Sequence, residues 1–261
     1  MLGLLGLTDV LLPLAQSFIA LGLSQAARDR LNQLTSEPAK QTEQGAAALT
    51  ELCSLSLSGL SARHEGALSG PQQVDLQLKA GDVLLLSGPS GCGKSTLLEV
   101  LAGEPLDYSG ERLLNGKAYE HWQWRSVIGY LPQQLDIFDM TLAENLRLGQ
   151  PAATEQQLWA VLEDVALADW ARARPAQLNT TLGEYGAQVS GGQARRIALA
   201  RLLLAQRPLL LLDEPFAGLD ADTREQVLAA LLRRQASGML VIVSHQPLEL
   251  EQAQRLQLTM N

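Results

Sequence analysis

Apolar residues fall into two patterns along the chain, and each predicts a different kind of element. Short, continuous apolar runs bounded by glycine or polar residues predict buried strands, and they occur at residues 83–86, 209–212 and 239–244. Apolar residues at helical spacing predict helices with one buried face, as they do at residues 96–101 and at Ile197, Ala200, Leu203 and Leu204.

A further set of amphipathic segments lies between Gln133 and Ser190. Residues 142–148 and 155–167 have helical patterns, which predict a helical subdomain at about residues 141–174. Trp159 and Trp170 are expected to pack against this subdomain rather than to contact a ligand.

A glycine-rich segment joins the strand predicted at 83–86 to the helix that follows. From Gly88 it reads GPSGCGKS, which has the G-x-x-x-x-G-K-[ST] spacing of a phosphate-binding loop. Glycines let successive N–H groups turn toward one anion, and the helix N-terminus adds partial positive charge. The candidate nucleotide contacts are Gly88, Ser90, Gly91, Cys92, Gly93, Lys94, Ser95 and Thr96. Lys94 is expected to reach the β- and γ-phosphates, and the Ser95 hydroxyl to ligate Mg²⁺.

Two acidic residues follow the run of leucines at 209–212. Asp213 is expected at the end of a buried strand, where its carboxylate would meet the Mg²⁺ shell. Glu214 is the candidate general base that polarises the attacking water. A solvated strand end is the alternative, but the spacing from the phosphate loop and the following Pro215 favour the catalytic interpretation.

The segment at Ser190 has the pattern of a helix start. Ser190 and Gln193 have the spacing of a capping box, and Gly191 and Gly192 lie between them. The glycines leave backbone N–H groups exposed at a helix N-terminus, where an anion can bind. An ordinary helix cap remains the alternative.

Taken in order, these motifs and the histidine after the strand at 239–244 resemble the ATP-binding cassette (ABC) ATPases, from about residue 52 to the C-terminus. In that family two cassettes pack head to tail, and the signature motif of one closes over the nucleotide of the other. The resemblance therefore implies that Ser190, Gly191, Gly192 and Gln193 contact ATP bound to a second cassette. Lys94, Ser95, Asp213 and Glu214 would act on the ATP that this chain binds.

Further roles follow from the same resemblance, one residue at a time. Gln133 in the sequence YLPQ is similar to the glutamine that contacts Mg²⁺ and the attacking water. His245 is similar to the histidine that contacts the γ-phosphate, and residues 217–220 are similar to the loop that crosses to the partner site. An aromatic residue that stacks on adenine is expected near residue 64, where no Tyr or Phe occurs. His64 is the candidate that replaces it.

Composition and charge narrow the possible partners. The 261 residues are 46% hydrophobic, enough for one α/β core and a smaller attached unit. The net charge of −8 argues against nucleic acid as the main partner, because binding a phosphate backbone requires clustered cations. Cys53 and Cys92 are the only cysteines in the sequence, so they cannot form a disulfide framework. This is typical of a protein domain in a reducing cytoplasm.

The N-terminus has a different character. Residues 1–23 are almost wholly apolar, and as a helix they would span about 34 Å, enough to cross a hydrocarbon core of about 30 Å. A buried helix of a soluble domain is the alternative. Arg28, Arg30 and a polar run at 35–45 follow. We expect residues 1–34 to be a last transmembrane helix with its cytoplasmic extension, 35–50 a linker, and 51–261 the cassette. An exporter half carries six such helices, so a truncated piece of a longer subunit or a remnant gene is expected.

The subtype resembled is an ABC exporter. Residues 141–149 (TLAENLRLG) and 182–186 (LGEYG) are similar to exporter sequences, and in exporters the second segment touches intracellular loops of the membrane domain. Glu184 is therefore a candidate coupling residue, with a solvated loop carboxylate as the alternative. Residues 91–98 and 12–18 are most similar to the second subunit of heterodimeric glutathione or cysteine exporters that support cytochrome bd assembly.

The resemblance implies a P-loop cassette with a mostly parallel core sheet, an antiparallel β part at about residues 52–78 and the helical subdomain. It implies hydrolysis of ATP with Mg²⁺, coupled to export of a thiol across the bacterial inner membrane, with the cassette on the cytoplasmic side. The partner would be a second exporter subunit, in a heterodimer or a homodimer. Alternatives are an exporter half for lipid or peptide, a soluble ABC ATPase outside transport, and a regulatory half that does not hydrolyse ATP.

Overall fold

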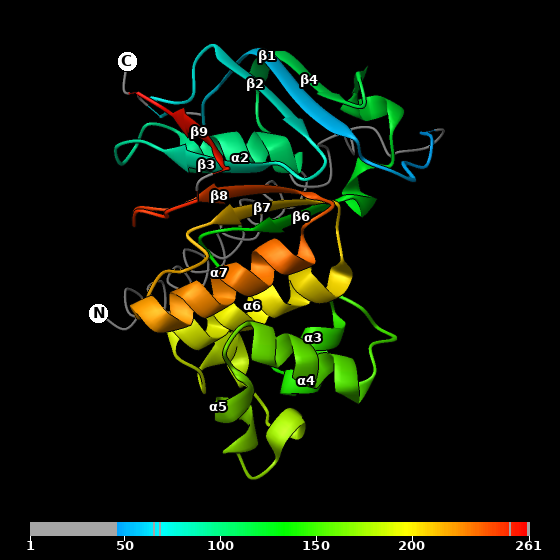
Figure 1. Ribbon diagram of the computed structural model, residues 1–261, viewed down its shortest axis with the longest axis vertical. Coiled ribbons are helices and arrows are strands. Elements are labelled where there is room, and N and C mark those ends of the chain that lie inside the picture. The colour runs from blue at the N-terminus through cyan, green and yellow to red at the C-terminus, as the bar shows by residue number, and fades with distance from the viewer. Residues whose placement is uncertain (1–45, 65, 68, 251, 260–261) are drawn as a thin grey trace, which may run out of the picture. The chain divides into compact units, whose positions relative to one another are not determined.

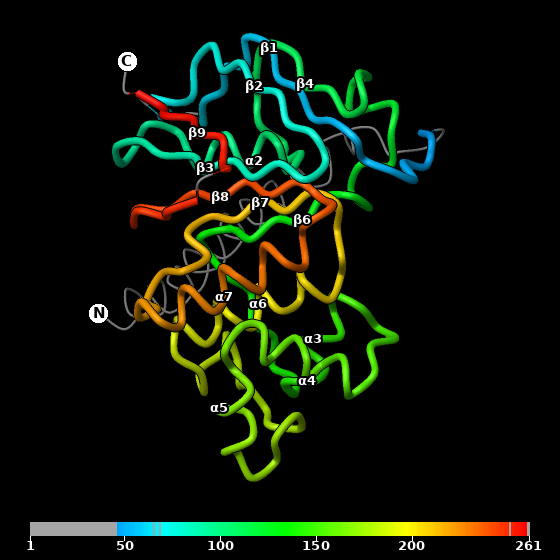
Figure 2. Tube along the Cα trace, in the orientation of Figure 1, coloured from blue at the N-terminus to red at the C-terminus, as the bar shows by residue number. Residues whose placement is uncertain are grey.

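The structure is a computed structural model that describes residues 46–64, 66–67, 69–250 and 252–259. Five parallel strands form its central sheet, in the order β6-β7-β8-β3-β9. Their bounds are β3 (Val83–Ser87), β6 (Ile128–Leu131), β7 (Leu209–Asp213), β8 (Met239–Val243) and β9 (Gln254–Gln257). The three strands predicted from apolar runs are confirmed. Figure 2 shows β9, near the C-terminus, beside β3 from the first half of the chain.

Alternate residues of β3, β7 and β8 face two separate hydrophobic clusters. Leu84 and Leu86 of β3 pack on the side of α2 (Lys94–Ala102). Leu85 packs on the opposite side, with α6 (Gly191–Ala205) and α7 (Ala221–Arg234). Figure 1 shows α2 above the sheet and the pair α6 and α7 below it. Both faces are covered, which explains why the strands have continuous rather than alternating apolar residues.

An antiparallel sheet lies on the far side of α2 (Figure 1). Its order is β2-β1-β4-β5, with the bounds β1 (Ser54–Ala62), β2 (Val74–Lys79), β4 (Tyr108–Leu114) and β5 (Lys117–Ala118). The predicted range 52–78 was therefore incomplete, because β4 and β5 follow the phosphate loop in sequence. β4 exposes most of its residues and contains Gly110 at φ 90°, so its sequence does not alternate as a strand with one buried face would.

The predicted helical subdomain contains α3 (Leu142–Arg147), α4 (Glu155–Asp164) and α5 (Ala168–Arg172), which extend from the face of α6. Thr141 and Thr154 start α3 and α4 with capping boxes. Trp159 and Trp170 pack against the core, as predicted. Short 3₁₀ helices occur at Tyr119–His121, Trp124–Ser126, Gln177–Asn179 and Glu184–Gly186.

The first described residue, Ala46, lies inside the predicted linker. Ala47 pairs with Trp122 and its N–H donates to the His121 carbonyl at 2.9 Å, while Leu49 is buried. Ala47 therefore contacts the segment that follows β5, and Leu49 belongs to the core cluster on the α2 side of the sheet. The transmembrane helix predicted within residues 1–34 lies outside the described residues. Among residues that are described, no helix combines the length and the hydropathy needed to cross a membrane.

Candidate active site

The candidate residues come together at the carboxyl edge of the parallel sheet. The phosphate loop follows β3, Asp213 ends β7, and Gln133 and His245 each come two residues after a strand. Because β6, β7, β8 and β3 are consecutive neighbours, their carboxyl ends form one edge. Ligands of α/β proteins bind outside this edge.

The backbone of the phosphate loop requires its glycines. Gly88, Gly91 and Gly93 have φ values of 148°, 81° and 93°. A Cβ on Gly88 would lie 2.5 Å from the Leu258 carbonyl oxygen, and one on Gly93 would lie 2.4 Å from Pro71 Cδ. Glycine is needed at both positions for conformation and for space, which preserves the concave shape of the loop.

Side chains of the loop divide into those that face the cradle and those that face the core. Lys94 begins α2, and its Nζ donates to the carbonyls of Gly88 at 2.9 Å and Pro89 at 2.8 Å. Its ammonium therefore lies over the loop. Cys92 and Thr96 are buried, whereas Ser90 is exposed and Ser95 is half-buried. Cys92 belongs to the core cluster, so only its backbone can face a phosphate.

Two carboxylates at the end of β7 have buried oxygens without hydrogen-bond partners. They are Oδ2 of Asp213 and Oε1 of Glu214. Buried polar atoms are normally paired, and unpaired ones mark a strained, catalytic or ion-binding position. His245 Nε2 lies 3.6 Å from Glu214 Oε1, which is close enough for electrostatic interaction and too far for a hydrogen bond.

Burial raises the pKa of the Glu214 carboxyl above its ordinary value. The neighbouring Asp213 carboxylate adds to this shift, while the charge of His245 opposes it. The raised pKa makes this carboxylate a stronger base than an ordinary glutamate. Its Oε1 has no hydrogen-bond partner among the described residues.

The backbone of Glu214 is also unusual. It has φ 51° although it is not a glycine, and its N–H donates to the Val243 carbonyl at 3.0 Å. Such left-handed backbone at a non-glycine residue persists where the surroundings hold it, and it clusters at functional sites.

Arg195 is a residue of this site that the sequence interpretation missed. Its guanidinium donates to the carbonyls of Asp213, Glu214 and Gln133. The Gln133 side chain itself is exposed beside the edge. The available signal was the position of a cation in the second turn of a helix, near the positive end of the helix dipole, which disfavours cations.

His64 forms a side-chain hydrogen bond that the sequence did not reveal. Its Nε2 lies 2.7 Å from Oε2 of Glu99 on α2, and both side chains are partly exposed. The imidazole is thus anchored to the same helix that begins with Lys94. His64 keeps an exposed ring surface, which is what contact with a nucleotide base would require.

The segment at Ser190 has the predicted capping box. Gln193 N–H donates to Ser190 Oγ at 3.3 Å, and Ser190 N–H donates to Gln193 Oε1 at 2.9 Å. A Cβ on Gly191 would meet no atom within 4 Å, and one on Gly192 would meet only the Gly218 carbonyl oxygen at 3.8 Å. Open space therefore lies above the first turn of α6, outside the phosphate loop of this chain.

The donor set fits a Mg²⁺ ion bound together with phosphates rather than by protein alone. Among the described residues, no group of three or more His, Cys, Asp or Glu side chains could hold a metal. Mg²⁺ commonly takes one or two carboxylates and completes its shell with water and phosphate oxygens. Asp213 offers a buried, unpartnered carboxylate oxygen for this purpose, and Ser95 offers a hydroxyl.

This sheet, loop and pair of carboxylates define a phosphate-loop nucleotide-binding domain. The ABC transporter family model matches residues 71–217, more than half of the chain, and the chain belongs to this family. It is the ATP-binding domain of an ABC transporter, as the sequence resemblance indicated.

Individual relatives show the same domain. The chain is 34% identical over 242 residues to the glutathione/L-cysteine transport system ATP-binding/permease protein CydC of Escherichia coli (strain K12), covering 91% of this chain and 42% of that protein. It is 32% identical over 256 residues to a multidrug resistance ABC transporter ATP-binding and permease protein of Lactococcus lactis subsp. lactis (strain IL1403), covering 94% of this chain and 42% of that protein. The chain thus spans about two fifths of the length of these relatives.

The fold is also that of a solved structure, a bacterial Atm1-family ABC exporter with ATP bound. The TM-score is 0.76 at 24% identity, and the match covers 87% of this chain and 40% of the other.

Proposed function

We propose that this domain hydrolyses ATP with Glu214 as the general base. The observation that carries the proposal is the Glu214 carboxylate: its Oε1 is buried, has no hydrogen-bond partner among the described residues and lies 3.6 Å from His245. A positioned carboxylate with a raised pKa can accept a proton from the attacking water. Lys94 would hold the β- and γ-phosphates, and His245 would contact the γ-phosphoryl group.

Ser95, Gln133 and Asp213 would hold the Mg²⁺ ion. When bound, Mg²⁺ would supply positive charge that stabilises the charge developing on the phosphates. The phosphate loop would orient the nucleotide through its backbone N–H groups and through the N-terminus of α2. His64 would contact the adenine ring, held in place by Glu99.

We propose further that the domain works in a head-to-tail pair with a second exporter subunit, as a heterodimer, with a homodimer as the alternative. Ser190, Gly191, Gly192 and Gln193 would contact the nucleotide bound to that partner. The open space above Gly191 and the exposed N-terminus of α6 support this role, because an incoming phosphate meets no side chain there.

A Ser190→Arg variant tests this shared site. The arginine would fill the open space above α6 with bulk. Paired with a native partner subunit, the variant should lose photolabelling of the partner by an azido-ATP analogue under turnover conditions and keep labelling of its own phosphate loop. Equal labelling of both subunits would contradict the shared site.

The transport context is the broader proposal. We propose that the domain powers an exporter in the bacterial inner membrane, with the cassette on the cytoplasmic side and residues 1–34 and 35–50 joining it to the membrane part. Glutathione or cysteine is the proposed substrate. The support is 34% identity to a relative whose name describes a glutathione/L-cysteine transport system. Glu184 would contact the membrane domain. It is exposed, and its neighbour Tyr185 is 96% exposed at φ 52°.

Transport in inside-out membrane vesicles tests the substrate. Vesicles containing the full-length subunit and its partner should accumulate labelled glutathione or cysteine when ATP is added, and a Glu214→Gln subunit should abolish accumulation. Since the identity to a multidrug relative is nearly as high at 32%, drugs, lipids and peptides are the competing substrates. ATP hydrolysis stimulated by one of these, with no thiol accumulation, would overturn the thiol assignment and leave hydrolysis intact.

A further inference from the structure

Arg195 connects three backbone carbonyls at the carboxyl edge of the sheet. Its Nη1 donates to the Asp213 carbonyl at 2.8 Å and the Glu214 carbonyl at 3.1 Å, and its Nη2 donates to the Gln133 carbonyl at 2.8 Å. The first two belong to the end of β7, and the third belongs to the segment after β6. One side chain from α6 thus ties the proposed base to the proposed Mg²⁺-contacting glutamine.

The geometry of these bonds requires arginine. A guanidinium is planar and presents donors in a fixed fork, so two of its nitrogens can address carbonyls of different segments at once. Burial lowers the pKa of Arg195, and the carboxylates of Asp213 and Glu214 oppose that shift. A half-buried cation near the N-terminus of α6 is unfavourable in itself, and its bonds to these carbonyls offset that cost.

Glu214 needs such an anchor. The residue before a proline is restricted to extended backbone, yet Glu214 precedes Pro215 and has φ 51°. Its N–H donates to the Val243 carbonyl at 3.0 Å, and its C=O accepts from Arg195 at 3.1 Å and from the Ala217 N–H at 3.2 Å. Bonds on both sides of the residue therefore fix the direction in which its carboxylate leaves the backbone.

We propose that Arg195 is a positioning residue for hydrolysis, which holds Glu214 and Gln133 in a fixed relation to each other. The inference rests on the proposed function of Glu214. Arg195 acts through the backbone carbonyls of these residues and not through direct contact with nucleotide or water.

Arg207 provides a matched control at the opposite edge of the same two strands. Its guanidinium donates to the Ser126 carbonyl, so it also joins the segments of β6 and β7, but at their amino ends. Methionine has a similar unbranched length and no donor, so Arg195→Met and Arg207→Met each remove the same kind of bond.

The experiment measures steady-state ATP hydrolysis, equilibrium binding of a fluorescent ATP analogue and the thermal midpoint for each variant. Arg195→Met should lower kcat about 100-fold, the effect of a displacement of about 1 Å at a reacting group, with binding changed little. Arg195→Lys should restore part of kcat, because it keeps the cation but reaches fewer carbonyls. Arg207→Met should keep the parent kcat at temperatures where it is folded.

A double variant tests whether Arg195 acts through Glu214. In a Glu214→Gln background, Arg195→Met should lower the residual kcat by a much smaller factor than in the parent, because Glu214, one of the two groups it positions, is already gone. An equal loss in both backgrounds, or parent kcat in Arg195→Met beside an inactive Glu214→Gln, would overturn the positioning role alone. Parent kcat in Glu214→Gln itself would overturn the proposed function.

Discussion

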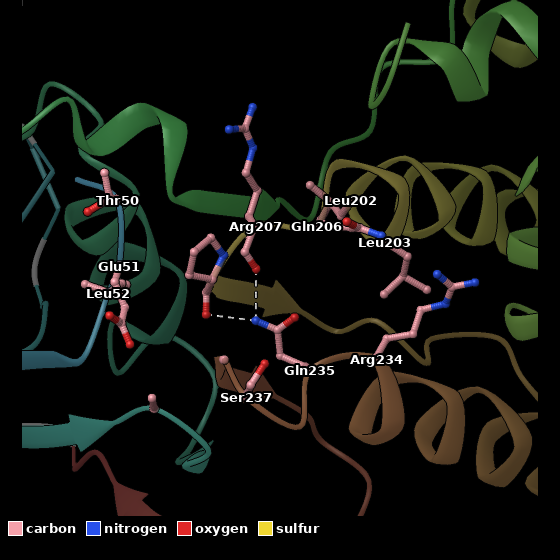
Figure 3. Close-up of a pocket in the computed structure, with 13 residues that line it drawn as sticks. Thr50, Glu51, Leu52, Leu202, Leu203, Gln206, Arg207, Arg234, Gln235 and Ser237 are labelled. Atoms are coloured by element: carbon pink, nitrogen blue, oxygen red, sulfur yellow. Dashed lines mark hydrogen bonds between the residues drawn. The ribbon is translucent and has the colours of Figure 1, made fainter. Parts of the chain in front are cut away.

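The carboxyl edge and the amino edge of the parallel sheet both carry polar side chains beside buried strands, but those side chains are satisfied differently. At the amino edge a cavity of about 440 Å³ is lined by Arg207, Gln235 and Ser237, among others (Figure 3). Gln235 Nε2 donates to the carbonyls of Arg207 at 3.0 Å, Pro208 at 2.9 Å and Met239 at 3.3 Å. At the carboxyl edge, Asp213 and Glu214 each have a buried oxygen without a partner.

The difference separates a structural edge from a chemical one. The amide of Gln235 donates to carbonyls at the starts of β7 and β8, so it links the ends of these strands. The unpartnered oxygens of the other edge cost stability and stay available for a metal ion or water. Of the two edges, the one with the unpartnered carboxylate oxygens has the groups for chemistry, and the one with the cavity does not.

Removing Lys94 should have the largest effect on ligand binding. Lys94→Ala should weaken ATP affinity by roughly 10- to 100-fold, because charge-assisted hydrogen bonds contribute about 1.5–3 kcal/mol. Calorimetry of ATP binding measures the change, and Lys79→Ala, an exposed lysine on β2, is the control. Unchanged affinity in Lys94→Ala would mean that the carboxyl edge does not bind phosphate.

Removing the amide at the amino edge should affect stability and leave turnover intact. Gln235→Leu removes a donor from three part-buried carbonyls, of which that of Pro208 keeps a bond from the Met239 N–H at 2.7 Å, and we expect a loss of about 1–3 kcal/mol in the free energy of unfolding. For a domain of this size that lowers the Tm by about 2–4 °C per kcal/mol. Thermal unfolding measures the change in Tm. Ser237→Ala is the control, because Ser237 lines the same cavity. A loss of turnover in the folded Gln235→Leu protein would contradict a purely structural role for the amino edge.

Glu214→Gln should raise stability in the absence of nucleotide. Because the folded-state pKa of Glu214 is raised above 4.5, the folded protein binds more protons than the unfolded chain between those two pKa values. Its stability therefore falls as pH rises through that interval and then stays level. The neutral amide removes this dependence, so the Tm advantage of Glu214→Gln should grow as pH rises through that interval and then stay level. A constant Tm difference from pH 4 to pH 8 would argue against the buried charge.

The smallest effect is expected at the base-contacting position. His64→Phe offers a larger aromatic face, and stacking of aromatic rings contributes about 0.5–1.5 kcal/mol, so ATP affinity should rise by roughly 2- to 10-fold. Glu99→Gln, which removes the carboxylate that His64 contacts, should lower affinity by a smaller factor. Titration with a fluorescent ATP analogue measures both. If neither change alters affinity, His64 does not contact the base.

The sequence predicted most of the carboxyl edge because its parts are local. The glycine spacing, the carboxylates after a leucine run and the capping box are each contained in a few residues, and the parallel sheet brings their ends together. β4 was missed because most of its residues are exposed and Gly110 interrupts the pattern. A period of two cannot be recognised in such a strand.

The contacts that escaped prediction join residues far apart in the chain. Arg195 reaches carbonyls 18, 19 and 62 positions away, and His64 pairs with a residue 35 positions away. Their donors show only as charged residues in sequence, whereas their acceptors are backbone carbonyls or a carboxylate on another element. Only the arrangement of strands and helices determines which of these meet.

The most direct test of the contrast between the edges measures ATP turnover and thermal midpoint on the same preparations of Glu214→Gln and Gln235→Leu. We expect opposite outcomes: Glu214→Gln loses at least about 100-fold in kcat, as expected for removal of a general base, and keeps or raises its Tm. Gln235→Leu loses Tm and keeps the parent kcat below its midpoint. Parent turnover in a folded Glu214→Gln protein would contradict the assignment of Glu214 as the general base.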